Sequence, residues 1–246
     1  MNKLLFEQLA VDYCCSEADV SDGLNHFSRH SFLPGRRRFS EGKECFLKIA
    51  VINGKLLFTG AEGIVGWCRQ RFEGDGGEWF FEAENLRSLD RRLCEDGYKI
   101  EMVHPFFIAD TPSAIEAGAY ELRWYGGDEI EQFRGDGRFN EAYAFCPDAP
   151  DVLGVAALQG GAILGMAGAS CDSPLMWQIG INVEPAARKS GIGTLLVSLL
   201  KNEVLRRGKL PYYGTSMSHI ASQRVALGAG FVPAWVELVT SKLNEG

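Results

Sequence analysis

The sequence predicts an α/β protein with a mixed sheet flanked by helices, together with a smaller N-terminal α/β lobe. Strand-like segments alternate with helical ones along the chain. With 246 residues, 46% of them hydrophobic and 23% charged, the composition is that of a globular protein of one large or two small domains. The order hairpin, helix, strand, helix, strand occurs from residue 46 and again from residue 162, which indicates a weak internal repeat.

Charge and cysteine content exclude several classes of protein. The net charge of −7 argues against general affinity for nucleic acids or anionic membranes, because phosphate binding needs a surplus of cations. No apolar run approaches the roughly 20 residues of a membrane span, and charged residues within 1–10 interrupt any signal-peptide core. The seven cysteines include no C-x-x-C pair, so we expect reduced thiols in a cytoplasmic protein.

A basic run, Arg36-Arg37-Arg38, follows the turn signal Pro34-Gly35. It is compatible with a solvated loop or with an anion-binding patch. Three cations are too few to carry the second interpretation, so we expect a solvated loop.

The N-terminal lobe is predicted from residue 46 onward. Two apolar segments, 46–52 and 55–60, are joined by Asn53-Gly54, which is typical of a type I′ hairpin because both turn residues need positive φ. The elements that follow are a helix over 62–72, a short strand over 78–82, an amphipathic helix over 84–96 that stops at Gly97, and a strand over 98–108. Turn-forming residues from Asp110 to Ser113 then separate domain 1–108 from domain 109–246.

The C-terminal domain begins with predicted strands and short helices. Strands are expected over 120–125, 152–158, 162–169 and 176–183, with one or two short helices within 126–140. Apolar residues at i, i+3, i+4, i+7 and i+8 from Ile192 predict an amphipathic helix that ends at Gly208. A strand over 210–215, a helix capped by Ser218 and running to Leu227, and a final strand region over 231–239 follow.

The segment from Arg188 to Gly193 lies between a strand and that amphipathic helix. Its two glycines let the backbone approach a ligand closely, and the first helix amides have no intrahelical partner. Together with the helix dipole they can form a phosphate site, although a plain tight turn gives the same pattern.

Competing signatures are absent from the sequence. It contains no P-loop, no G-x-G-x-x-G after a strand, no H-E-x-x-H and no G-x-S-x-G. We therefore expect no nucleotide-hydrolysing loop, no Rossmann site, no catalytic metal and no hydrolase nucleophile.

Two segments resemble the GNAT N-acetyltransferase superfamily. The run from Val183 to Gly193, VEPAARKSGIG, resembles its motif A, V-x-P-x-x-[QR]-x-x-G-x-[GA]. His219-Ile220-Ala221-Ser222, followed by Gly230-Phe231, resembles its second signature, N-x-x-[AS]…G-F. The resemblance covers about residues 115–246 and implies a GNAT fold, in which strands 176–183 and 210–215 splay apart.

The resemblance also implies a ligand. Acetyl-CoA, as cosubstrate, would lie between the splayed strands, and an amine would attack its thioester directly. The backbones of Ile181 and Val183 would hold the pantetheine arm, and His219 and Ser222 would also contact the cofactor. The pyrophosphate would bind at the amides of the loop formed by Arg188, Lys189, Ser190, Gly191, Ile192 and Gly193.

Three departures leave catalysis unassigned. His219 stands where the family has asparagine, Ala226 stands where it often has a tyrosine acid, and strand 176–183 contains no carboxylate. Asp172 and His219 remain candidate bases, although a turn-forming role and a cofactor contact are the favoured interpretations. The remaining candidates are interpreted as packing or solvated residues: Cys171, Glu184, Trp124, Trp177, Trp235, His26, His30 and His104.

The expected function is transfer of an acetyl group to a primary amine of a small molecule or peptide. The alternatives are a non-catalytic CoA-binding regulatory or sensory module, and a protein that binds another nucleotide at Gly191. In the N-terminal lobe, Gly60-Ala61-Glu62-Gly63 occupies the place of the phosphate loop and carries an acid. This lobe would then be a degenerate GNAT-like half that binds no CoA and instead walls the substrate site or forms a homodimer.

Overall fold

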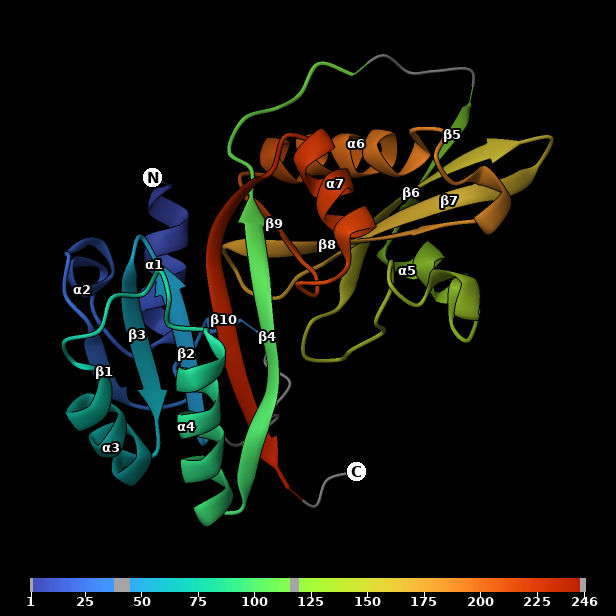
Figure 1. The fold of residues 1–246 in the computed structure, drawn as a ribbon. Helices are drawn as coiled ribbons and strands as arrows, with labels where there is room; N and C mark the ends of the chain where they lie inside the picture. The colour runs from blue at the N-terminus through green and yellow to red at the C-terminus, as the bar shows by residue number, and fades with distance from the viewer. Residues whose placement is uncertain (1, 38–44, 116–119, 244–246) are drawn as a thin grey trace. The chain divides into compact units, whose positions relative to one another are not determined.

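A computed structural model describes residues 2–37, 45–115 and 120–243. The chain forms two compact units, Met1–Phe106 with Ala234–Gly246, and Phe107–Pro233. Strands β4 (Tyr98–Ile108) and β10 (Val232–Lys242) each run from one unit into the other. The division differs from the expected boundaries, 1–108 and 109–246, because most of β10 groups with the N-terminal unit (Figure 1).

The described residues of the first unit form a hairpin, four helices and three further strands. Its helices are α1 (Lys3–Asp12), α2 (Glu17–Ser21), α3 (Glu62–Phe72) and α4 (Ala83–Glu95), and its first three strands are β1 (His26–Arg29), β2 (Leu47–Ile52) and β3 (Lys55–Gly60). The strands follow the order β1-β3-β2-β10-β4. Positive φ at Asn53 and Gly54, 53° and 76°, confirms the predicted hairpin.

The second unit is a sheet with helices on both faces. Its strands are β5 (Glu121–Gly126), β6 (Asp151–Gln159), β7 (Ala162–Ser170), β8 (Met176–Val183) and β9 (Leu210–Gly214), and its helices are α5 (Gly127–Ile130), α6 (Ile192–Arg206) and α7 (Ile220–Gly228). The strand order is β9-β8-β7-β6-β5, antiparallel except for the parallel pair β8–β9. Short 3₁₀ turns cover Glu131–Phe133, Gly137–Phe139 and Pro185–Ala187.

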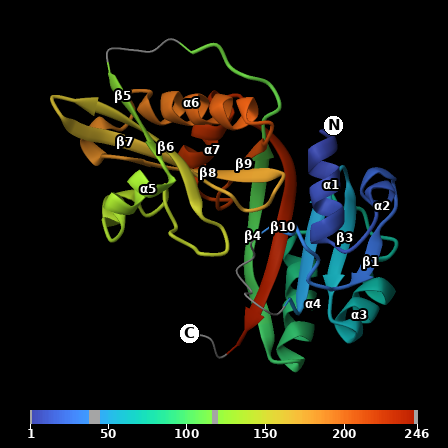
Figure 2. The same ribbon diagram turned by 180° about the vertical axis from the view of Figure 1, so that it is seen from behind.

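Strand alternation places the core of the second unit on two faces of this sheet. On β6, Val155 and Ala157 pack with α6, whereas Ala156 and Leu158 pack with α5 and the turns that follow it. Figures 1 and 2 accordingly show α6 and α5 on opposite faces of the sheet. The predicted mixed sheet flanked by helices is therefore confirmed.

Most predicted elements are confirmed, and three expectations are wrong. Residues 78–82 form consecutive turns instead of a strand, since Phe80 and Glu82 donate backbone hydrogen bonds to Gly77 and Trp79. The N-cap residue of helix α7 is His219, not the predicted Ser218, and the His219 side chain makes no capping hydrogen bond. The expectation of a solvated basic loop fails at Arg37, which is only 2% exposed; Arg38 lies outside the described residues.

Two further sequence expectations concern thiols and membranes. All seven cysteines are free, and Cys45 and Cys68 are buried. No helix among the described residues combines the length and the hydropathy that crossing a bilayer requires.

Candidate functional site

Strands β8 and β9 are paired over only part of their length. Their register covers three pairs, from Met176–Leu210 to Gln178–Tyr212. β8 then continues to Val183 and remains paired with β7. This is the divergence that the resemblance implied, and below it is called the β8–β9 divergence.

The backbone of β8 turns two of its residues toward this divergence. The amide of Glu184 donates to the carbonyl of Leu164 at 2.9 Å, on the β7 side. In an antiparallel ladder, hydrogen-bonded and non-hydrogen-bonded pairs alternate. The pairs of Val183 with Gly165 and of Ile181 with Ala167 are therefore non-hydrogen-bonded. Ile181 and Val183 consequently direct their N–H and C=O groups to the β9 side.

The loop before α6 presents amides and two cations. Lys189 and Gly191 have positive φ, 65° and 86°, and Gly191 caps the helix without a side-chain hydrogen bond. The first amides of this 15-residue helix, including those of Ile192 and Gly193, have no partner within the helix. The residues of this loop therefore form the positive end of the helix dipole.

The side chains of this loop have two different roles. Arg188 and Lys189 are exposed, and the Arg188 Nε donates to the carbonyl of Val183 at 3.3 Å. The Ser190 hydroxyl donates to the carbonyl of Ala187 at 2.6 Å, which closes the loop on itself. Arg188 and Lys189 thus supply positive charge at the exposed surface of the loop, whereas Ser190 shapes the turn.

Helix α7 places the second group of predicted residues. His219 is exposed at its start. The hydroxyls of Ser222 and Tyr213 lie 2.8 Å apart, so Ser222 lies beside β9. Burial raises the pKa of Tyr213, and the Ser222 hydrogen bond opposes that shift. Ala226 is fully buried in the core, so this position offers neither a polar group nor access to a ligand.

Asp172 is buried, with 4% of its surface exposed. Its carboxylate accepts a hydrogen bond from the Ser170 hydroxyl at 2.5 Å and a second one from the Tyr212 hydroxyl. None of the ion pairs among the described residues involves it. Asp172 therefore anchors the turn before β8 to β9, and both its oxygens are engaged away from solvent.

A row of glycines crosses three strands of this sheet. Gly154, Gly168 and Gly180 are register partners on β6, β7 and β8. A Cβ atom at any of the three would overlap the segment from Glu141 to Tyr143. The absence of side chains lets this segment lie directly on the sheet, next to the open part of β8. The three glycines are far apart in sequence and align only through the strand register, so the row has no local sequence signal.

The other candidate residues take packing or ion-pairing roles. Trp177 and Trp235 are buried, and Trp124 is 40% exposed. Glu184 lies 3.7 Å from Arg138, and the Cys171 thiol donates to the carbonyl of Ser173. Burial lowers the pKa of His30 to about 4, with the positive charges of Lys48 and Arg36 acting in the same direction, and it also lowers the pKa of His104.

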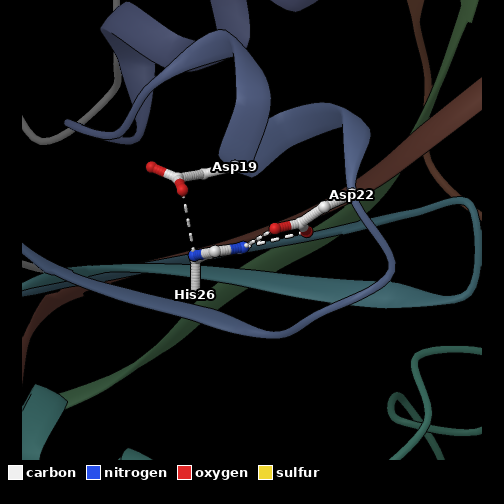
Figure 3. A group of neighbouring side chains, drawn as sticks. All are labelled: Asp19, Asp22 and His26. Carbon is white, nitrogen blue, oxygen red and sulfur yellow. Dashed lines mark hydrogen bonds and ion pairs between the residues drawn. The ribbon is translucent and has the colours of Figure 1, made fainter.

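One group in the first unit has the composition of a metal site. His26 lies between Asp19 and Asp22, with Nδ1 3.6 Å from the first carboxylate and Nε2 2.9 Å from the second (Figure 3). The buried ammonium of Lys55, however, lies 2.9 Å from the Asp22 carboxylate, and its hydrogen bond holds the pKa of Asp22 below the ordinary value. We assign the group to structural ion pairing, since Lys55 already supplies the cation.

The first turn of α3 in the first unit differs from that of α6, because it carries an acidic residue. Glu62 stands in the first turn of α3, and its carboxylate lies 3.8 Å from Arg29. The negative charge thus occupies the positive end of that helix dipole.

A comparison with family models matches residues 119–231 to the model described as "Acetyltransferase (GNAT) family". No curated protein matches the chain. The solved structures similar to it include an acetyltransferase of the GNAT family from Novosphingobium aromaticivorans DSM 12444, with 17% identity over 59% of this chain and 68% of that chain and a TM-score of 0.42. A GCN5-related N-acetyltransferase-like protein from Streptococcus suis 89/1591 has 11% identity over 85% of this chain and 89% of that chain, with a TM-score of 0.48. A tandem GNAT protein from the clavulanic acid biosynthesis pathway has 17% identity over 67% of this chain and 60% of that chain, with a TM-score of 0.45. Similarity at this level carries no information about the substrate.

Proposed function

Since residues 119–231 belong to the acetyltransferase (GNAT) family, we propose that the chain transfers the acetyl group of acetyl-CoA to a primary amine. Acyl transfer is the reaction class of this family. The β8–β9 divergence, with the loop from Arg188 to Gly193 at its end, is the observation that carries the proposal. The seven free thiols favour a reducing compartment such as the cytoplasm.

The residues at the divergence fit the successive parts of the cosubstrate. The amides of Ser190, Gly191, Ile192 and Gly193, with the charges of Arg188 and Lys189, are a site for a pyrophosphate. The outward N–H and C=O groups of Ile181 and Val183 can pair with an amide-containing arm as a neighbouring strand would. The side chains of His219 and Ser222 lie at the start of α7 and complete the proposed binding residues.

The proposed chemistry depends on the position of the two reactants and on polarisation of the acetyl carbonyl. The thioester supplies an activated acetyl carbonyl. Backbone N–H groups of β8 that face the divergence can polarise that carbonyl, and binding both reactants there holds them in attacking geometry. A primary amine attacks directly, so no covalent enzyme intermediate and no metal are part of the proposal.

A second candidate function is a non-catalytic CoA-binding module. It is favoured by the buried alanine at position 226 and by the lack of a carboxylate on β8. The two functions differ in turnover, because a module would bind CoA without releasing thiol from acetyl-CoA in the presence of any amine.

The first test is a thermal-shift series with acetyl-CoA, CoA, ATP and NADH. A ligand at 100 times its Kd stabilises the folded chain by about 2.7 kcal/mol, which raises Tm by about 5 to 10 °C for a chain of this size. We expect such a shift with acetyl-CoA and CoA only. A shift with ATP or NADH instead, or none at all, would contradict the proposal.

Two charge-removing variants test the loop. Arg188→Ala removes a cation beside the proposed pyrophosphate site, whereas Arg206→Ala removes one at the opposite end of the same helix. A charge-assisted hydrogen bond contributes about 1.5–3 kcal/mol. We therefore expect the Kd for CoA to rise about tenfold or more for Arg188→Ala and to stay unchanged for Arg206→Ala.

The first unit is proposed to bind no CoA, because Glu62 occupies the start of α3. Its proposed role is instead to form a homodimer. A single CoA bound per chain in a calorimetric titration is the expected stoichiometry, and two would contradict this part of the proposal.

A further inference from the structure

The proposed reaction lacks an assigned group that removes the proton from the attacking ammonium. β8 has no carboxylate, and the Asp172 carboxylate is buried and engaged by two hydroxyls. Glu141 is an acidic residue that lies beside the open part of β8. Two sets of contacts with β8 fix its main chain, and its effect on the pKa of Tyr213 agrees with that position.

The first feature is a pair of hydrogen bonds from β8. The Asn182 Oδ1 atom accepts hydrogen bonds from the backbone N–H groups of Glu141, at 2.9 Å, and Ala142, at 2.8 Å. Asn182 also donates through its Nδ2 to the Asn140 side chain at 3.3 Å. One side chain of β8 therefore fixes the main chain on both sides of Glu141.

The second feature is the close approach that the glycine row permits. A Cβ atom at Gly180 would overlap the carbonyl oxygen of Glu141, and one at Gly168 would overlap that of Ala142. Gly180 and Asn182 flank Ile181, whose backbone groups face the divergence. The main chain of Glu141 thus lies against the part of β8 that is proposed to hold the thioester end of the cosubstrate.

The third feature is the electrostatic effect of Glu141 on β9. Tyr213 follows directly after the last residue of β9 that is paired with β8. Beyond the effect of burial, the negative charge of Glu141 raises the pKa of Tyr213. This effect places the negative charge of Glu141 near Tyr213, and Glu141 itself is exposed to solvent.

We propose that Glu141 is the catalytic base of the proposed acetyl transfer, held in place by Asn182 and Gly180. The inference rests on the proposed function. It assigns the proton acceptor to the segment that follows α5, not to β8 or to Asp172.

The proton balance is simple. The Glu141 carboxylate takes one proton from the acceptor ammonium, which leaves a neutral amine. The amine nitrogen forms a bond to the acetyl carbonyl carbon, the carbon–sulfur bond breaks, and its electron pair goes to sulfur. The second proton lost by nitrogen goes to the thiolate, and the exposed Glu141 carboxyl returns its proton to solvent.

A proximity label tests this placement without knowledge of the acceptor. In a Glu141→Cys variant, the introduced thiolate should displace bromide from bromoacetyl-CoA, with formation of a carbon–sulfur bond and release of bromide. The control is Glu121→Cys, which places a thiol at an exposed position of β5. The unsubstituted chain gives the background of its seven native thiols. Peptide mass spectrometry locates the label.

We expect labelling at position 141 at least tenfold faster than at position 121, with protection by excess CoA. If CoA stabilises the chain but position 141 is labelled no faster than position 121, the assignment of Glu141 is wrong and the proposed function stands. If neither CoA nor bromoacetyl-CoA raises Tm, the proposed function itself fails, and the inference falls with it.

Turnover gives the second readout. With spermidine, tyramine or the dipeptide Ala-Ala as acceptor, thiol release is measured for Glu141→Gln and the control Glu121→Gln. Loss of a general base costs about 10²- to 10⁴-fold in rate, so we expect that loss at pH 7 for Glu141→Gln alone. The deficit should shrink as pH rises toward the pKa of the amine. An equal rate, or a deficit independent of pH, with any acceptor that supports turnover would overturn the inference.

Discussion

Arg37 is buried in the first unit between two carboxylates. Its Nε atom lies 2.5 Å from the Asp12 carboxylate and its Nη2 atom 2.8 Å from that of Glu237, with all three side chains at most 3% exposed. The Arg37 amide also donates to Asp12 at 2.8 Å, and the guanidinium stacks 4.9 Å from the Trp235 ring. Replacing Arg37 with Met keeps much of the apolar volume and removes the charge.

The expected loss of stability is large. Removing one partner of a buried ion pair costs about 3–5 kcal/mol, because it leaves the other charge uncompensated. Arg37→Met removes the ion-pair partner of both Asp12 and Glu237. Lys48 is then the remaining buried cation near Glu237. The loss is a substantial share of a typical unfolding free energy of about 5–15 kcal/mol.

The same variant should reverse the pH dependence of the contribution that Glu237 makes to stability. Burial alone raises the pKa of Glu237, but the charges of Arg37 and Lys48 outweigh burial and hold the pKa below its ordinary value. In the parent chain, this group therefore contributes stability above about pH 4.3, the ordinary pKa of Glu, and the contribution is lost as pH falls through the lower folded-state pKa. Without Arg37, only Lys48 and the Tyr13 hydroxyl oppose the effect of burial, so we expect the folded-state pKa of Glu237 to rise. The variant should then gain relative stability as pH falls toward about 4.3.

Urea unfolding followed by tryptophan fluorescence, at pH 7 and pH 4.5, measures both effects. The matched control is Arg36→Met, which removes a partly exposed cation one residue away that stacks on Phe32 and should cost about 1 kcal/mol or less. The reasoning is refuted if both variants lose the same free energy at pH 7. It is also refuted if the deficit of Arg37→Met is as large at pH 4.5 as at pH 7.

Substitutions at three further positions, all in the second unit, have defined outcomes. Tyr212→Phe removes a donor to the buried Asp172 carboxylate and should cost about 1.5–3 kcal/mol, measured by urea unfolding. Gly180→Ala forces a Cβ atom against the Glu141 carbonyl and should cost about 1–3 kcal/mol, seen as a fall in Tm of several degrees. Gly191→Ala meets no neighbouring atom but keeps φ at +86°, so it should cost about 1–2 kcal/mol; Gly191→Asn, which tolerates this conformation, should cost less in the same assay.

The parts of the fold that were predicted correctly depend on local signals. The hairpin at Asn53-Gly54 and the stop at Gly97 each follow from the conformation of one or two residues. Helix α3 and strand β8 occupy the predicted residues, 62–72 and 176–183. In these segments the apolar spacing and the flanking turn residues favour the same structure, so local sequence alone is enough to predict it.

The parts that were predicted wrongly depend on distant contacts. The aromatic segment 78–82 has strand-like composition, but Gly77 donates to the carbonyl of Gly54 at 2.8 Å, and this contact with the hairpin directs the segment into turns. Arg37 reads as part of a surface charge run, yet its carboxylate partners lie 25 and 200 residues away in sequence. Neither contact has a local signature.

The two halves of the proposed site differ in the same way. The proposed cosubstrate loop can be predicted from the sequence because its glycines and cations are contiguous, from Arg188 to Gly193. Glu141 was missed because its position is determined by Asn182, 41 residues later, and by a glycine row that exists only once three strands are in register.

This difference separates the effects of substitutions in the two halves. The loop amides belong to α6 and its cap, so a change at Gly191 or Arg188 should alter CoA binding without moving the main chain of Glu141. Asn182 contributes its side chain to the Glu141 segment, whereas the proposed cosubstrate contacts of β8 are backbone groups of its neighbours. Asn182→Ala should therefore slow labelling of the Glu141→Cys variant while the Tm shift with CoA is retained. If both readouts fell together in that variant, Asn182 would be holding β8 itself, and the two halves of the site would be one unit.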